Sequence, residues 1–286
     1  GLDYARSLVQ TSDEGYALVG YTGAKSWLVK TDANGDVQWN KTYWRAGFVY
    51  YAHSLVQTVD GGYALAGCTT ASGTLDFWLV KTDTSGNMIW NQTYGGARSE
   101  VAYSLVQTVE GGYAMAGVTE SSEFGSSDFW LVKTDADGNM QWNKTYGGTR
   151  SEYAYSLVQA SNGGYALAGF TESFVASYND FWLVKTDANG NVQWNKTYGG
   201  EINEYAHSII QTSDGGYALA GFTNSFGAGC GDFWLVKTDA NGSMIWNQTY
   251  GGTNWDGANS LVQTVDGGYA LAGFTDSFGA GDYDFW

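Results

Sequence analysis

The segment Ser156–Tyr198, SLVQASNGGYALAGFTESFVASYNDFWLVKTDANGNVQWNKTY, decides how the whole chain is interpreted. Near-copies of it occur from one end of the 286-residue sequence to the other. The tryptophan that opens its WLVKTD motif recurs every 51 or 52 residues, at Trp27, Trp78, Trp130, Trp182, Trp234 and Trp286. A fixed period near 50 residues is typical of a repeat architecture. The chain therefore divides into six repeats, at approximately 1–48, 49–98, 99–150, 151–202, 203–254 and 255–286.

Each repeat contains four short apolar runs, here called A to D, separated by turn signals. In the fourth repeat these runs cover residues 156–159, 165–171, 180–187 and 191–198. The Asn-Gly and Gly-Gly pairs between them favour tight hairpins, because these residues accept positive φ at low cost. The runs are rich in Val, Tyr, Trp, Phe and Thr, as strands are. We therefore predict an all-β fold, a six-bladed β-propeller of four-stranded repeats forming a single domain over residues 1–286.

Composition excludes several classes of partner. The formal net charge is −16, which repels the phosphates of DNA and RNA, so we expect no nucleic-acid partner. No apolar run approaches the roughly 20 residues of a membrane span, so we expect no membrane insertion. The sequence also offers no cluster of metal ligands, and we expect neither a metal site nor a cofactor.

The repeat signature GGYALAG…DFWLVKTDANGN..WNKTYGG resembles that of secreted and cell-surface β-propeller proteins of archaea and bacteria. The resemblance covers the whole chain and implies an extracellular or cell-surface location, often within larger surface proteins. It supplies no catalytic residues. The first repeat departs from the signature, because Lys25 and Ser26 replace its Asp-Phe pair, and the sixth repeat stops at Trp286.

Variation between repeats concentrates in two of the four connections. The A–B and C–D turns barely change, whereas the B–C loops and the D–A connections differ in length and composition. In an antiparallel blade these two variable connections share one end, here called the top face, and binding usually resides on variable loops of a rigid scaffold. Two tryptophans outside the repeated positions, Trp44 and Trp255, fall in D–A connections. We predict that they anchor a sugar or protein partner, with packing beneath the loop as the alternative.

A second candidate binding position directly precedes the repeated serine of run A. It holds four different residue types in the six repeats, and is occupied by Arg6, His53, Tyr103, Tyr155, His207 and Asn259. The Ser-His adjacency in two repeats does not predict a nucleophile and its base, because adjacent strand residues point to opposite faces. We predict instead that the six residues line the mouth of the axial channel and contact a ligand.

Repeated carboxylates have a structural interpretation. The segment Asp32–Asp36 and its equivalents resemble a calcium loop only in part, because glycine comes fourth and no glutamate follows, so we predict hairpin turns. A further aspartate begins run C in five repeats. We expect these carboxylates to bond backbone N–H groups of their own loops rather than to form a cation-binding ring. They are Asp76, Asp128, Asp180, Asp232 and Asp284.

The N-glycosylation pattern Asn-x-Thr recurs in run D of five repeats. Its asparagines are Asn40, Asn91, Asn143, Asn195 and Asn247. Duplication copies such a motif together with its repeat, so the alternative is an inherited strand motif without sugar. We predict a glycoprotein in which some of these residues carry N-glycans.

The sequence thus favours a non-catalytic extracellular or cell-surface module, with a structural or adhesive role and recognition of glycans or proteins through the top-face loops. The alternative is a propeller enzyme, a hydrolase or lyase with its site in the axial funnel. At the chain end, run C of the sixth repeat stops at Trp286, so the last blade is incomplete. We expect either that the native chain continues or that the open edge drives self-association, because unpaired strand edges recruit other strands.

Overall fold

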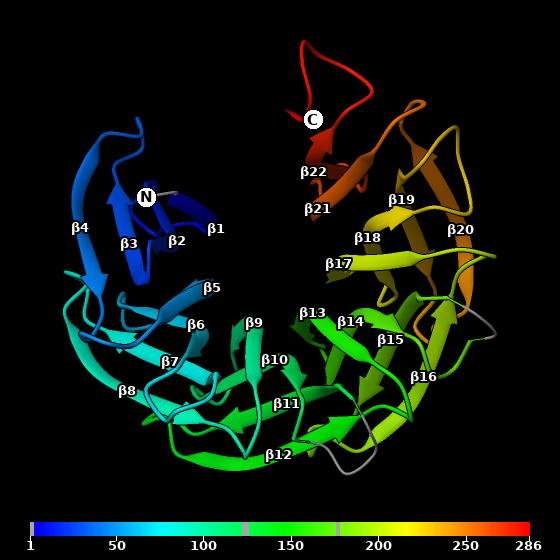
Figure 1. The fold of residues 1–286 in the computed structure, drawn as a ribbon. Helices are drawn as coiled ribbons and strands as arrows, with labels where there is room; N and C mark the ends of the chain where they lie inside the picture. Colours follow the sequence, from blue (N-terminus) through cyan, green and yellow to red (C-terminus); the bar gives the residue numbers. More distant parts are fainter. Residues whose placement is uncertain (1–2, 122–125, 176–177) are drawn as a thin grey trace. The chain divides into compact units, whose positions relative to one another are not determined.

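The computed structural model describes residues 3–121, 126–175 and 178–286, and within them every regular element is a β-strand. The strands form six antiparallel sheets in which neighbours in sequence are neighbours in space, five with four strands and one with three (Figure 1). This is the predicted β-propeller fold, with one repeat per blade and an incomplete last blade. No helix in the described residues is long and apolar enough to cross a membrane.

The chain divides into two compact units. Unit 1 comprises Gly1–Glu123 with Phe129–Thr145, and unit 2 comprises Phe124–Asp128 with Tyr146–Trp286. Blades 1 to 3 belong essentially to unit 1. Their strands are β1 Asp3–Gln10, β2 Tyr16–Thr22, β3 Lys25–Thr31, β4 Val37–Tyr43, β5 Tyr50–Gln57, β6 Tyr63–Thr69, β7 Asp76–Thr82, β8 Met88–Tyr94, β9 Glu100–Gln107, β10 Tyr113–Thr119, β11 Asp128–Thr134 and β12 Met140–Tyr146.

Blades 4 to 6 belong to unit 2. Their strands are β13 Glu152–Gln159, β14 Tyr165–Thr171, β15 Asp180–Thr186, β16 Val192–Tyr198, β17 Glu204–Gln211, β18 Tyr217–Thr223, β19 Asp232–Thr238, β20 Met244–Tyr250, β21 Asp256–Gln263, β22 Tyr269–Thr275 and β23 Asp284–Phe285.

The first strand of each blade is longer than run A suggested. In blade 4 it begins at Glu152, four residues before the repeated Ser156, and the D–A connection is correspondingly shorter. The pairing between β13 and β14 shifts register between Ala154 and Ser156, so Tyr155 lies in a β-bulge. The same shift occurs in all six blades. A bulge inserts one residue and re-aims its side chain, which the sequence pattern did not indicate.

The invariant turns close as predicted. In blade 1 the Asp32 carboxylate accepts hydrogen bonds from the backbone N–H groups of Asn34 and Asp36, both at 2.9 Å. Gly35 has φ of 87°, a conformation that glycine adopts without strain. The equivalent aspartates of the other C–D turns, Asp83, Asp135, Asp187 and Asp239, accept the same pair of backbone bonds. These segments are therefore hairpin turns.

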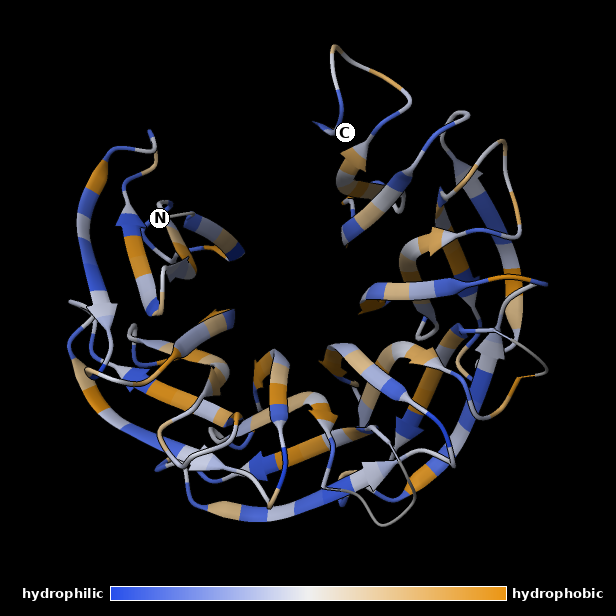
Figure 2. Cartoon of the chain, in the orientation of Figure 1, coloured by the Kyte–Doolittle hydropathy of each residue, from blue (hydrophilic) through white to orange (hydrophobic). Residues whose placement is uncertain are grey.

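The core lies between neighbouring blades, and Figure 2 shows that long hydrophobic segments fall on strands such as β7 and β11. All seven residues of β7 and of β11 are buried, so both faces of each strand are covered. Within unit 2, Phe181 and Leu183 of blade 4 pack in one cluster with Tyr217, Trp234 and Val236 of blade 5. Burial of this kind stabilises the stack by roughly 25 cal/mol per Å² of apolar surface.

Candidate functional site

The six residues that precede the repeated serine all occupy the β-bulge of their blade, and each unit brings its own three together. In unit 1 the Arg6 guanidinium donates to the Tyr21 hydroxyl at 2.6 Å. The His53 ring lies 6.3 Å from that of Tyr21 and 5.5 Å from that of Tyr103. Arg6, His53 and Tyr103 thus form one connected group, with Tyr21 as the link.

In unit 2 two of the three bulge residues, Tyr155 and His207, belong to a larger row of rings. Neighbouring rings in this row lie 4.8–6.4 Å apart, within the range of favourable aromatic contacts. The row is here called the unit 2 aromatic surface, and its members are Tyr153, Tyr155, Phe170, Tyr205, His207, Phe222 and Trp255. Apart from buried Phe170, its residues are half-buried or exposed.

Cross-strand pairing explains why the rings line up. Tyr153 of β13 lies opposite Phe170 of β14, and Tyr205 of β17 lies opposite Phe222 of β18. Both pairs are stacked, with interplanar angles of 10° and 27°. These four residues were not predicted, because they lie neither before the repeated serine nor in the variable loops. Their signal was available, since the Phe170 position is Cys68 in blade 2 and Val118 in blade 3.

The two histidines are uncharged at neutral pH. Burial, followed by repulsion from the Arg6 charge, lowers the pKa of His53 to about 4. Burial likewise lowers the pKa of His207, although its bonds to the Ala258 carbonyl and the Asn259 side chain oppose the effect. His207 Nδ1 lies 3.1 Å from the Ala258 oxygen, which fixes the ring in the tautomer that donates from this nitrogen. Both rings therefore serve as neutral aromatic and hydrogen-bonding groups.

The repeated serine has a structural task. Ser156 Oγ accepts a hydrogen bond of 3.2 Å from the backbone N–H of Ile209 in the next blade. Ser54 Oγ accepts the equivalent bond, 3.1 Å, from Leu105 in unit 1. These bonds join the first strands of neighbouring blades, which explains why the serine recurs while the histidine does not.

The two loop tryptophans have different surroundings. Trp255 is 37% exposed, and its ring stands edge-on to Phe222 at 5.5 Å, so it extends the unit 2 aromatic surface. Trp44 is 53% exposed and lies under the ammonium group of Lys25, 4.3 Å from the ring centroid. This cation–π contact joins two residues with which the first repeat departs from the others. The structure thus brings Trp255, and not Trp44, together with bulge residues of its own unit.

Buried acids at the start of the first strands are a further feature that the sequence analysis missed. Glu204 is fully buried and accepts hydrogen bonds from Gly200 N, Thr223 Oγ1 and Ser225 N at 2.8–3.2 Å. It thereby ties the D–A connection to the B–C loop. Glu100, Glu152 and Asp256 hold the same position in their blades and are also fully buried. These acids directly follow the variable D–A connections, so their recurrence was hard to recognise in the sequence.

Some of the aspartates that begin run C bond backbone N–H groups of their own loops, as predicted, and others do not. Asp232 and Asp284 each accept a hydrogen bond of 2.9 Å from a backbone N–H of their own B–C loop, which confirms the prediction for these two. Asp76 instead accepts from the hydroxyls of Ser72 and Thr74. Asp180 bonds the Glu204 carboxyl of the next blade, and burial together with this neighbour raises the pKa of Asp180 to about 6. Asp180 is therefore protonated in weakly acidic solution.

The sequon asparagines also have structural partners. In each of five blades the side-chain oxygen accepts a hydrogen bond of 3.1–3.3 Å from the indole N–H of the run C tryptophan. The pattern thus holds neighbouring strands together whether or not sugar is attached. Glycosylation of these residues stays a prediction.

Comparison with solved structures identifies β-propellers as structural neighbours. The WD40 domain of Neurospora crassa Pan2 matches with a TM-score of 0.59 and 12% identity over 93% of this chain and 71% of that one. Chaetomium thermophilum Sqt1 matches with a TM-score of 0.57 and 12% identity, over 91% of this chain and 64% of that one. A Bacteroides caccae protein of unknown function matches with a TM-score of 0.54 and 12% identity, over 87% of this chain and 82% of that one. At such identities the likeness concerns the fold alone.

Sequence comparison adds one curated relative. The regulatory protein FlaEY of Caulobacter vibrioides is 28% identical over 173 residues, which is 56% of this chain and 16% of that protein. This chain therefore spans about a sixth of the relative that it matches. No family model matches the sequence.

Proposed function

We propose that this chain is a non-catalytic recognition module acting outside the cell or at its surface, and that the unit 2 aromatic surface binds carbohydrate. The observation that carries the proposal is the unbroken row of rings that runs from Tyr153 to the exposed Trp255. Sugar rings present apolar C–H faces that pack on aromatic side chains, and hydroxyls that need polar partners. His207 within the row and Asn259 beside it are uncharged hydrogen-bonding groups.

The surroundings of the candidate catalytic groups support binding rather than chemistry. A histidine whose pKa is depressed by burial is a weak general base at neutral pH. The Ser54 hydroxyl, which directly follows His53 in the sequence, already accepts a hydrogen bond from the backbone N–H of Leu105. Within residues 3–121, 126–175 and 178–286, no three His, Cys, Asp or Glu side chains are grouped to hold a metal ion.

A glycan array tests the proposal, with the fluorescently labelled 286-residue chain as the probe. We expect binding to one carbohydrate class, weakened about 10-fold or more by Trp255→Ala, because an aromatic anchor contributes on the order of 2 kcal/mol. Trp44→Ala is the matched control, since it removes another exposed loop tryptophan outside the unit 2 aromatic surface. We expect the recovered glycan to be intact by mass spectrometry.

Three outcomes oppose the proposal. Equal losses in both tryptophan variants would show that the unit 2 aromatic surface is not the site. Cleavage of the glycan would favour the hydrolase or lyase alternative. Binding to a panel of surface proteins, without any glycan signal, would replace carbohydrate with a protein partner on the same loops.

A further inference from the structure

The A–B turn of blade 4 departs from a pattern that the other five blades share. Each of the other turns begins with a threonine and carries an acid two residues later. The acids are Asp13, Asp60, Glu110, Asp214 and Asp266. In blade 4 the same two positions hold Ala160 and Asn162. Asn162 still closes the turn, because its Oδ1 accepts a hydrogen bond of 3.2 Å from the Gly164 N–H. What blade 4 lacks is therefore the negative charge.

The missing acid leaves a buried lysine without a counterion. In blades 1, 2, 3 and 5 the run C lysine forms an ion pair of 2.8–3.9 Å with the acid of its own A–B turn. The pairs are Lys30–Asp13, Lys81–Asp60, Lys133–Glu110 and Lys237–Asp214. Lys185 of blade 4 is only 3% exposed, and no carboxylate in the described part of the chain forms an ion pair with it. Because a buried charge without an opposite charge is unfavourable, an anion that reached this ammonium group would be stabilised.

Neutral atoms surround the Lys185 ammonium group instead. It donates to the Thr186 carbonyl at 2.7 Å, to Asn162 Oδ1 at 3.2 Å and to Gln193 Oε1 at 3.4 Å. The Asn162 Nδ2 group donates to none of the residues that the structure describes. The turn of blade 4 thus offers hydrogen-bond donors where the other turns offer a carboxylate. An ammonium group beside an amide N–H suits a carboxylate ligand, whose two oxygens accept several hydrogen bonds.

One nearby acid does not take the place of the missing one. The charge of Asp187, in the C–D turn, acts on Lys185. The equivalent Asp135 acts in the same way on Lys133, which has Glu110 in addition. Asp187 therefore belongs to the constant part of the repeat, and blade 4 remains one negative charge short.

A pocket of about 500 Å³ borders the Lys185 ammonium group, between the A–B and C–D turns of blades 4 and 5. It is here called the Lys185 pocket. Lys185 is its buried cation, and four side-chain amides line it, those of Asn162, Gln193, Gln211 and Asn241. Amides both donate and accept hydrogen bonds, which matches the hydroxyl groups of a polar ligand.

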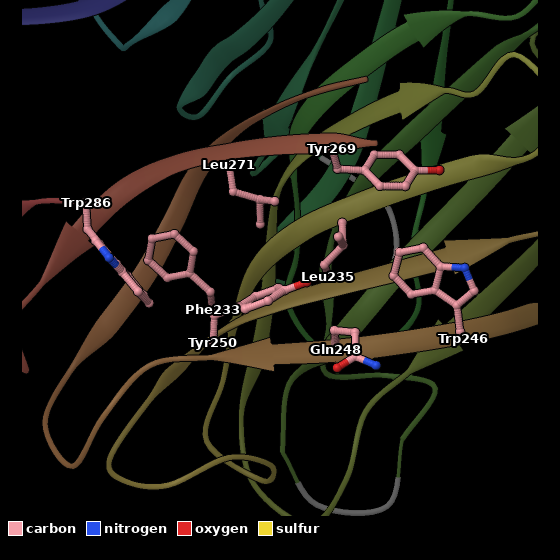
Figure 3. A pocket seen from close by; sticks show the side chains of 8 residues that line it. All are labelled: Phe233, Leu235, Trp246, Gln248, Tyr250, Tyr269, Leu271 and Trp286. Carbon is pink, nitrogen blue, oxygen red and sulfur yellow. The ribbon is translucent and has the colours of Figure 1, made fainter. Parts of the chain in front are cut away.

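Two aromatic rings also line the Lys185 pocket. The half-buried Trp194 stands edge-on to Tyr217 of blade 5, with ring centroids 5.9 Å apart. The same arrangement recurs at the next junction, where Figure 3 shows Trp246 and Tyr269, whose centroids lie 5.7 Å apart. The lysine of that junction, Lys237, is already paired with a turn acid. The aromatic pair thus belongs to the repeat, whereas the lysine without a counterion is individual to blade 4.

We propose that the Lys185 pocket binds a sugar that carries a carboxylate, that is, a uronic acid. The carboxylate accepts hydrogen bonds from the Lys185 ammonium group and the Asn162 amide, and it supplies the charge that the other turns supply themselves. The sugar hydroxyls bond the amides of Gln211 and Asn241, and the sugar ring packs on Trp194. A carboxylate carries one negative charge and so matches a single lysine.

This site is separate from the unit 2 aromatic surface. The Lys185 pocket lies at the end of the blades that holds the A–B and C–D turns, whereas Trp255 lies in a D–A connection at the other end. The failure of one proposal therefore leaves the other standing.

Isothermal titration calorimetry with D-galacturonic acid tests the proposal, and D-galactose is the matched neutral probe. We expect saturable binding of galacturonic acid, and binding of galactose about 10-fold weaker or more, because galactose lacks the charged acceptor. Asn162→Asp should also weaken the binding of galacturonic acid about 10-fold or more, because the new carboxylate pairs with Lys185. This variant should keep its fold and its melting temperature, since the other five turns carry an acid at this position.

Asn189→Asp is the control for the change in charge. It makes the same substitution in the C–D turn of blade 4, at a position where blade 3 carries Asp137, and Asn189 does not line the Lys185 pocket. We expect this variant to bind galacturonic acid as the wild type does.

Four results would overturn the proposal. The first is the absence of galacturonic acid binding to a chain whose near-UV circular dichroism is native. The second is equal affinity for galacturonic acid and galactose, and the third is undiminished binding by Asn162→Asp. The fourth is tighter binding of N-acetylglutamate than of galacturonic acid, since this would assign the pocket to an acidic peptide.

Discussion

Replacing Asp180 with asparagine should make unit 2 more stable at neutral pH and leave its stability in acid almost unchanged. The Asp180 carboxyl lies against Glu204, which is fully buried and already accepts three hydrogen bonds. Burial and this acidic neighbour raise the pKa of Asp180 to about 6, from an ordinary value of 3.8. Ionised Asp180 therefore repels a carboxylate that the fold requires.

The sign and size of the effect follow from proton linkage. Between about pH 4 and pH 6 the folded state binds more protons at Asp180 than the unfolded state does, so stability falls as pH rises through this window. Above about pH 6 Asp180 is ionised in both states, and the stability that its protonated form contributes is fully lost. A pKa difference of this size corresponds to at most ~3 kcal/mol. Because Asp180 is partly accessible to solvent, screening reduces our expectation to about 1 kcal/mol.

Urea denaturation followed by tryptophan fluorescence at pH 4, 6 and 8 measures this effect. The free energy of unfolding of the Asp180→Asn variant should exceed that of the wild type by about 1 kcal/mol at pH 8. The two values should converge toward pH 4. Asp284→Asn is the matched control, because Asp284 holds the same repeat position but accepts a hydrogen bond from the backbone N–H of Ala280. Parallel pH profiles for the wild type and Asp180→Asn would refute the reasoning.

Three other predictions concern contacts that recur between or within blades. Tyr198→Phe should lower the free energy of unfolding by about 1 kcal/mol in chemical denaturation, because it leaves the Gly242 carbonyl without its donor. Tyr250→Phe should lower it little, and equal losses in the two variants would contradict the prediction. Gly221→Ala should cost more than about 3 kcal/mol and reduce the soluble yield, because its Cβ would lie 1.8 Å from the Tyr205 carbonyl oxygen; a normal melting temperature would contradict it. The intact mass of host-derived protein should exceed that of the bare sequence if Asn195 and its equivalents carry glycans, whereas an unmodified mass would leave only their bonds to tryptophan.

The sequence predicted the blades because local and global signals agree in every repeat. Short apolar runs, glycine-containing turns and a constant period all specify the same four-stranded unit. The buried lysines of the third strands could not be placed in this way. Lys237 is 5% exposed, and only the structure shows that its ammonium group reaches Asp214 across a turn.

The candidate site was predicted in part. Comparison of the repeats identified His207 and Tyr155, because binding residues usually occupy variable positions on a constant scaffold. It did not reveal the bulge that re-aims them, because a bulge changes register without changing composition. Nor did it link Tyr155 to Phe170, since their contact depends on strand pairing and on the bulge together.

A co-crystal structure with the strongest glycan from the array tests the central claim most directly. We expect a sugar ring packed on Trp255 and Phe222, with its hydroxyls in reach of His207 or Asn259 and with every glycosidic bond intact. A sugar bound away from the unit 2 aromatic surface, or a cleaved product in that place, would contradict the account.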